Sequence, residues 1–222
     1  MKQLVKNRLN SLLIIGIIVL YIAFLSLDIF SIPRSIHSRY LKYASIVLCL
    51  MLASSFALQS RNKRDSNYVV LALIFTMMAD TFLLFTHHQI TGVFFFCLVQ
   101  LIYLKRYNSR FFKVGICFSV IAAIVHLLLP FQPLYVIAGL YALLIGSCFL
   151  STFHTKLPKF NLYSARIGMF LFILCDIHVA LYNQLSTSFS YYRFVTVAMW
   201  LFYLPSQFLL AMSASYPKVD HH

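Results

Sequence analysis

The stretch YVVLALIFTMMADTFLLFT, residues 68–86, decides the fold class because it is long and apolar enough to cross a lipid bilayer. A spanning helix needs about 17 to 25 mostly apolar residues, and this stretch carries one charged side chain, Asp80. Lipid offers no hydrogen-bond partners to the backbone, so a spanning segment must satisfy its own polar groups as a helix. The stretch therefore predicts a transmembrane helix with an acid inside it.

Further apolar blocks of similar length follow one another along the 222 residues, separated by short connections that are basic or contain proline. The chain is 61% hydrophobic and 10% charged, whereas a soluble domain carries about 25% charged residues. We therefore predict an all-α, polytopic membrane bundle of eight helices that forms a single integral membrane domain over residues 1–222. The predicted spans are about 11–28, 40–58, 68–86, 89–104, 111–129, 133–150, 165–182 and 193–213.

The basic residues sort by side once eight spans are drawn, which puts both termini on one side of the membrane. Fourteen of the 18 lysines and arginines fall on the side of the termini, and only Arg34, Arg39, Lys42 and Arg193 fall on the other. Basic loops stay in the cytoplasm, so we expect cytoplasmic termini in a multi-pass protein of the bacterial cytoplasmic membrane. This distribution accounts for the net charge of +13, and nucleic acid is not an expected partner.

Two acids lie within apolar blocks. The chain has five aspartates and no glutamate, and Asp80 and Asp176 sit about twelve and eleven residues into spans that start on the same side. At 1.5 Å per residue both would lie roughly 16–18 Å from that side, just past the middle of the bilayer. An aspartate there costs about 2.5–3.5 kcal/mol and usually faces a bundle interior. We expect one shared site, the alternative being two acids that are each satisfied separately by a neighbour.

The pair of acids favours two functions. Two carboxyl groups close together in an apolar site titrate as a unit, and one can hold a proton while the other is ionised, as general acid and base catalysis requires. Paired intramembrane aspartates also suit a proton-coupled transporter or flippase of a lysolipid or small amphiphile. The sequence contains no recognisable metal or nucleotide motif, so we expect no cofactor.

Short similarities between the halves of the chain suggest a weak 4+4 internal repeat. MADTFLLF at 78–85 parallels LCDIHVAL at 174–181. The span after each acid also carries a glutamine and a tyrosine three or four residues apart, hence on one helix face. These residues are Gln100 with Tyr103, and Tyr203 with Gln207.

Two more side chains are candidates for binding a substrate. Asn183 follows Asp176 by seven positions, so it lies on nearly the same face of its helix. Lys42 lies at the outer end of its span, where a long side chain can snorkel to a lipid phosphate or simply anchor the helix at the interface.

Four segments carry a resemblance to the lysoplasmalogenase (YhhN-like) family of eight-span membrane proteins. MADTFLLFTHHQITGVFFFCLVQLIYLKRY, 78–107, resembles the first family signature, and ARIGMFLFILCDIHVALYNQ, 165–184, is similar to the second. YLPSQFLLAMS, 203–213, looks like the closing Tyr-x-x-x-Gln stretch, and RYLKYAS, 39–45, is similar to an early lysine-containing segment. The order and spacing of the four segments match the family from about residue 39 onward.

The resemblance implies an enzyme that cleaves the vinyl ether bond of a lysoplasmalogen, with Asp80 and Asp176 as its catalytic residues. It implies a lysophospholipid substrate and water as partners, with Gln100, Tyr103, Tyr203 and Gln207 orienting the reacting groups. Three positions depart from the family pattern: alanine replaces glycine before Asp80, cysteine replaces serine before Asp176, and glutamine stands at position 100, where histidine is common.

Overall fold

The computed structural model describes residues 2–30, 38–184 and 189–215, and these form eight helices without a strand. Each helix is long and apolar enough to cross a membrane. The predicted all-α, eight-helix fold is therefore confirmed, and each predicted span lies in one helix to within two residues. The helices are α1 Lys2–Phe30, α2 Ser38–Gln59, α3 Lys63–Phe85, α4 Gln89–Tyr107, α5 Ser109–Leu128, α6 Pro133–Ser151, α7 Lys159–Gln184 and α8 Phe189–Met212.

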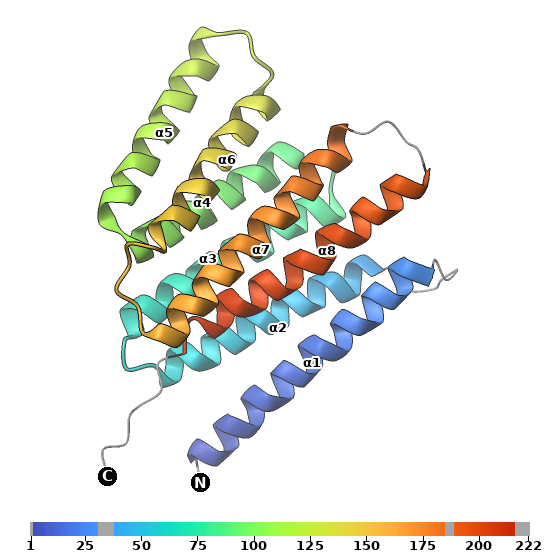
Figure 1. The fold of residues 1–222 in the computed structure, drawn as a ribbon, viewed down its shortest axis with the longest axis vertical. Coiled ribbons are helices and arrows are strands. Elements are labelled where there is room, and N and C mark those ends of the chain that lie inside the picture. The colour runs from blue at the N-terminus through green and yellow to red at the C-terminus, as the bar shows by residue number, and fades with distance from the viewer. Residues whose placement is uncertain (1, 31–37, 185–188, 216–222) are drawn as a thin grey trace.

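Successive helices run in opposite directions, and most pack against their neighbours in sequence (Figure 1). Helix α8 also contacts α1, α2 and α3, and this brings the end of the chain back to its beginning. Helices α5 and α6 form a hairpin at the edge of the bundle, where α5 buries only Gly115. The interior of the molecule is therefore built mainly from α2, α3, α4, α7 and α8.

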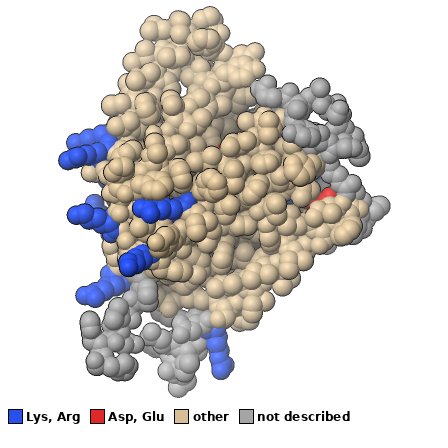
Figure 2. Space-filling view, in the orientation of Figure 1, with Lys and Arg blue, Asp and Glu red and all other residues tan. Residues whose placement is uncertain are grey.

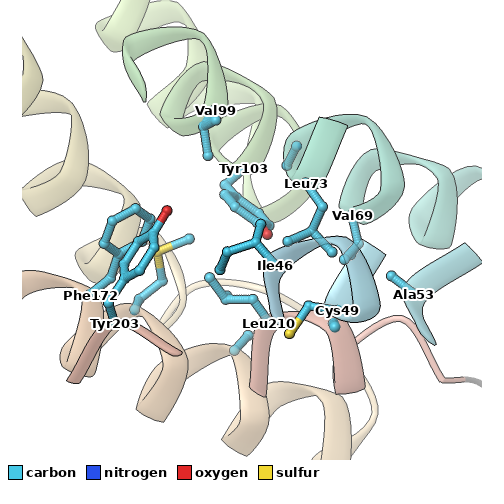
Figure 3. Close-up of a cluster of buried hydrophobic side chains, with 14 of the residues drawn as sticks. Ile46, Cys49, Ala53, Val69, Leu73, Val99, Tyr103, Phe172, Tyr203 and Leu210 are labelled. Carbon is cyan, nitrogen blue, oxygen red and sulfur yellow. The ribbon is translucent and has the colours of Figure 1, made fainter. Parts of the chain in front are cut away.

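These five helices share one core, part of which is drawn in Figure 3. Apolar side chains from α2, α3, α7 and α8 point toward one another, and Tyr103 reaches into the cluster from α4. The labelled members are Ile46, Cys49, Ala53, Val69, Leu73, Val99, Tyr103, Phe172, Tyr203 and Leu210. Tyr103 and Tyr203 therefore place two hydroxyl groups within this apolar core.

Charge is concentrated at one end of the bundle. Helix α1 begins and α8 ends at this end (Figure 1), and the Lys and Arg side chains visible in Figure 2 gather along the same edge. Among the described side chains, Arg39 and Lys42 are the basic residues at the opposite end, while those of Arg34 and Arg193 lie outside the described part. We call the two ends basic and outer; the assignment of the basic end to the cytoplasm stays a prediction.

A buried ion pair joins four helices at the basic end. Arg106 in α4 donates hydrogen bonds of 2.8 to 3.1 Å to the carboxylate of Asp65 in α3. The same guanidinium donates to the hydroxyl and the carbonyl oxygen of Ser213, each at 2.7 Å, just after α8 ends. Asn161 in α7 donates to that carbonyl at 2.9 Å. We call this group the basic-end lock, because it ties the starts of α3 and α7 to the ends of α4 and α8.

A proline within α8 explains a contact with α1. Pro205 has no N–H, so the carbonyl oxygen of Leu201, four residues earlier, loses its partner within the helix. The hydroxyl of Tyr21 in α1 donates to that oxygen at 2.9 Å. The hydrogen bond satisfies a backbone group that lipid cannot, and it holds α1 against the part of α8 that carries Trp200 and Tyr203.

Two glycines differ in how closely a neighbouring helix packs against them. A Cβ at Gly168 in α7 would lie 3.0 Å from Cγ of Leu210 and 3.2 Å from the carbonyl oxygen of Ser206, both in α8, whereas one at Gly139 would meet nothing within 4 Å. We expect Gly168→Ala to lower the stability of the fold, because overpacking costs about 1–3 kcal/mol. Gly139→Ala should raise it by up to about 1 kcal/mol through helix propensity. Thermal unfolding in detergent compares the two variants, and equal stability would contradict the predicted tight approach of α7 and α8.

Candidate functional site

Asp80 is buried in α3 and is held by a tyrosine from α8. The hydroxyl of Tyr203 donates to the Asp80 carboxylate, with its oxygen 2.9 Å from Oδ1 and 2.8 Å from Oδ2. Side chains lean toward the N-terminus of their helix, and α3 and α8 run in opposite directions, so the two side chains lean toward each other. Among the described residues neither of the two Lys or Arg ion pairs involves Asp80, which leaves a carboxyl group satisfied by a neutral donor.

Asp176 is half-buried in α7 and has the same kind of partner. The hydroxyl of Tyr141, in the adjacent and antiparallel helix α6, donates to Oδ2 of Asp176 at 2.7 Å. Its partner comes from the preceding helix, whereas that of Asp80 comes from the other half of the chain. The two acids thus share a chemistry, but their hydrogen bonds do not follow the predicted repeat, which stays a prediction.

The two acid and tyrosine pairs meet on one aromatic ring. The centroid of the Phe96 ring in α4 lies 5.9 Å from that of Tyr141 and 6.4 Å from that of Tyr203. The structure therefore brings the two acids to one neighbourhood, formed by α3, α4, α6, α7 and α8.

Both acids lie in the outer part of their helices. Asp80 follows the start of α3 at Lys63 by 17 positions, and Asp176 follows the start of α7 at Lys159 by 17. Both are thus about 25 Å along their helices, and Asp80 is five residues before the end of α3 at Phe85. The helices begin five and six residues before the predicted spans, and the depth of the two acids in the bilayer stays a prediction.

Lys42 is buried near the outer end and is paired within the protein. Its Nζ lies 2.7 Å from Oδ2 of Asp28 in α1 and 4.8 Å from the centroid of the Trp200 ring. That ring contacts Tyr203 edge-on at 5.1 Å. Tyr43 and Thr81, the neighbours of Lys42 and Asp80, are joined by a hydrogen bond of 3.0 Å. Lys42 therefore lies at the level of Asp80 and is connected to its tyrosine through Trp200.

The predicted glutamines and the third tyrosine are buried. Gln100 and Tyr103 in α4 and Gln207 in α8 each keep at least one polar side-chain atom without a hydrogen-bond partner. Gln207 also lies at 3.4 Å from the hydroxyl of Ser206. These three side chains line the interior on the basic side of the two acids.

Asn183 does not join the site. Its side chain is exposed, and its amide donates to the carbonyl oxygen of Val179 in its own helix at 2.9 Å. A separation of seven positions puts two residues on one face, but it also moves Asn183 about 10 Å toward the outer end. The expectation that it contacts a substrate has no support in this position.

Three members of the site were not singled out from the sequence: Phe96, Tyr141 and Trp200. Tyr141 is a lone polar group in the apolar stretch IAGLYALLIG, 137–146, and Trp200 is the only tryptophan. Both facts could have marked these positions. Their partners could not have been named, because a tyrosine in a helix can face any neighbour until the packing is known.

Fold and site together define a multi-pass α-helical membrane protein with two buried carboxyl groups, each hydrogen-bonded to a tyrosine, in one interior site. The YhhN family model matches residues 38–214, which include every helix from α2 to α8 and all the groups around the two acids. The chain belongs to the YhhN family, as its motifs suggested. No curated protein and no solved structure shows significant similarity to it.

Proposed function

We propose that the protein is an intramembrane hydrolase that cleaves the vinyl ether bond of a lysoplasmalogen. The observation that carries the proposal is the meeting of the two acid and tyrosine pairs, Asp80 with Tyr203 and Asp176 with Tyr141, on the ring of Phe96. Intramembrane acids are costly and mark functional sites. Membership of the YhhN family supports the same reading.

The reaction needs an acid, a counter-charge and water. Proton transfer to the outer carbon of the vinyl ether gives an oxocarbenium ion, and water adds to its cationic carbon. Loss of a proton from the added water leaves a hemiacetal. Its carbon–oxygen bond then breaks to give a fatty aldehyde and the glycerophospho-alcohol, so one water is consumed and the acid is restored. No oxidant, metal or cofactor enters this balance.

The surroundings of the two acids suit different roles. A buried carboxyl group without a cation is most stable as the neutral acid, and Asp80 is 4% exposed with Tyr203 as its hydrogen-bond donor. We therefore assign protonation of the substrate to Asp80. Asp176 is half-buried, and we assign it to the ionised form that stabilises the cation and accepts the proton of the attacking water. Tyr203 and Tyr141 position the two carboxyl groups.

The lipid fits with its head group at the outer end. In a lysoplasmalogen only the glycerol backbone separates the phosphate from the vinyl ether. Lys42 and Asp80 lie at one level, because their neighbours Tyr43 and Thr81 are hydrogen-bonded. Lys42 can hold the phosphate by exchanging its contact with Asp28, while the vinyl ether lies beside Asp80. Gln100, Tyr103 and Gln207 would then bind the glycerol hydroxyl or water, and the alkenyl chain would follow the aromatic side chains.

The test is the formation of fatty aldehyde from a lysoplasmalogen by the purified protein in detergent or liposomes. We expect aldehyde in equal amount to the released glycerophospho-alcohol, and none from the lysophospholipid with an ester at the same position. Ester cleavage at the same rate would contradict vinyl ether chemistry. Movement of the lysolipid across a proteoliposome membrane without aldehyde would replace this proposal with the transporter.

A further inference from the structure

A row of unpartnered polar groups runs through the interior from the basic-end lock to Asp80. The row lies on one face of α4 and on the facing sides of α3 and α8. Its members are 0 to 4% exposed, and each keeps at least one polar atom without a hydrogen-bond partner. They are Thr76 in α3, Gln100, Tyr103 and Tyr107 in α4, and Gln207 in α8.

The spacing of these groups places them in stripes along their helices. Tyr107, Tyr103 and Gln100 are separated by four and three positions, so they follow one stripe along α4. Thr76 precedes Asp80 by four positions in α3, and Gln207 follows Tyr203 by four in α8. Each stripe thus ends beside a member of the Asp80 pair, or, for α4, at Phe96.

The backbones of α4 and α8 do not pack closely against each other. Long side chains bridge them instead: Arg106 reaches Ser213 at the basic end, and Phe96 reaches Tyr203 toward the outer end. Gln100, Tyr103 and Gln207 project into the interval between these bridges. In Figure 3 the hydroxyl of Tyr103 points among apolar side chains of the neighbouring helices.

Unpartnered polar atoms at this depth require an occupant. Buried polar groups in proteins are almost always hydrogen-bonded, to protein or to ordered water. Internal water binds where several polar groups converge. Six such atoms lie on five side chains of the row, and of these side chains Gln100 also lies close to the hydroxyl of Tyr141.

We infer that the row binds a file of ordered water molecules that connects Asp80 to the basic end of the protein. Arg106 and Asp65 close the file at that end, beside Tyr107. The site exists whether or not the protein is a hydrolase. If the proposed function holds, the water that is consumed reaches Asp80 from the basic end, while the lipid approaches from the bilayer.

Radiolytic footprinting tests the file, because hydroxyl radicals formed from bound water label the side chains next to it. We expect Tyr103 and Tyr107 of the folded protein to be labelled several-fold faster than Phe24 and Met169, after each rate is divided by its rate in the unfolded chain. Phe24 and Met169 are as buried but carry no polar side-chain atoms. Labelling of the two tyrosines no faster than these references would overturn the inference.

A stability measurement gives a second and independent readout. Thr76→Val and Gln207→Leu remove partners of the water, so they should reduce the labelling of Tyr103 and should not raise the thermal stability. If the interior is dry, both variants remove an uncompensated polar group and raise stability, which would contradict the inference. Ser147→Ala is the control, because Ser147 hydrogen-bonds within its own helix and lies away from the row.

The inactive variant separates this inference from the proposed function. Asp80→Asn keeps a polar side chain at the end of the file, so the labelling of Tyr103 should persist although hydrolysis is lost. A protein that is labelled but forms no aldehyde would refute the hydrolase and keep the water file. A protein that forms aldehyde without labelling would support the hydrolase and refute the water file.

Discussion

If the proposed hydrolase is right, we expect Asp80→Asn to slow aldehyde release from a lysoplasmalogen by a factor of about 10² to 10⁴, the usual contribution of general acid–base catalysis. An amide of the same shape accepts the Tyr203 hydrogen bond but has no proton acidic enough to give to carbon. The measurement is the initial rate of aldehyde formation at saturating lipid, with the amount of folded protein determined for each variant. A variant that keeps the parent rate would remove Asp80 from the mechanism.

Two tyrosine variants sharpen this result. Tyr203→Phe leaves Asp80 in place without its donor, so we expect a smaller loss of about tenfold, the equivalent of one hydrogen bond of roughly 1.4 kcal/mol. Tyr163→Phe is the matched control, since Tyr163 is 60% exposed on α7, and its rate should equal that of the parent. Equal losses in both would indicate a general effect of tyrosine removal instead of a positioning role.

We expect Arg106→Met to lower the free energy of unfolding by about 3–5 kcal/mol, because it removes one partner of the buried ion pair with Asp65. The same change removes two hydrogen bonds to Ser213, so α4 is also released from the end of α8. Reversible unfolding in mixed micelles measures the loss. A change below about 1 kcal/mol, the range of exposed ion pairs, would contradict the basic-end lock.

The double variant and a neighbouring arginine identify the cause. Asp65→Asn together with Arg106→Met also removes the charge of the Asp65 carboxylate, so it should recover a large part of the stability lost in the single variant. Arg110→Met is the control four positions further along the chain, because Arg110 is exposed at the start of α5. Its stability should change by less than about 0.5 kcal/mol.

The fold could be predicted from the sequence because the membrane imposes a simple rule on each segment. Length and apolarity decide whether a segment spans, and the backbone then has to be helical. Both quantities are local, so the eight spans were located without knowledge of their neighbours. The ends were less accurate: α3 begins at Lys63 and α7 at Lys159, because polar and basic residues can extend a helix beyond the hydrocarbon.

Only part of the candidate site could be predicted from the sequence. Asp80 and Asp176 are conspicuous because an acid in an apolar block is costly. Lys42 lies at the outer end of its helix, as predicted, but its pairing with Asp28 depends on how α1 lies against α2. Asn183 lies on the expected face but too far along its helix, and its side chain bonds to its own backbone. Helical spacing predicts the face of its own helix on which a residue lies, but it does not predict which other helix packs against that face.

The sequence alone determined that this protein crosses the membrane eight times and carries two acids inside, because solvation by lipid acts on each segment by itself. The tertiary structure decided which groups surround those acids. Tyr203 reaches Asp80 across 123 positions of the chain and Tyr141 reaches Asp176 across 35, and both tyrosines meet at Phe96. Such partnerships depend on the rotation and crossing of whole helices against one another, which no local pattern of residues encodes.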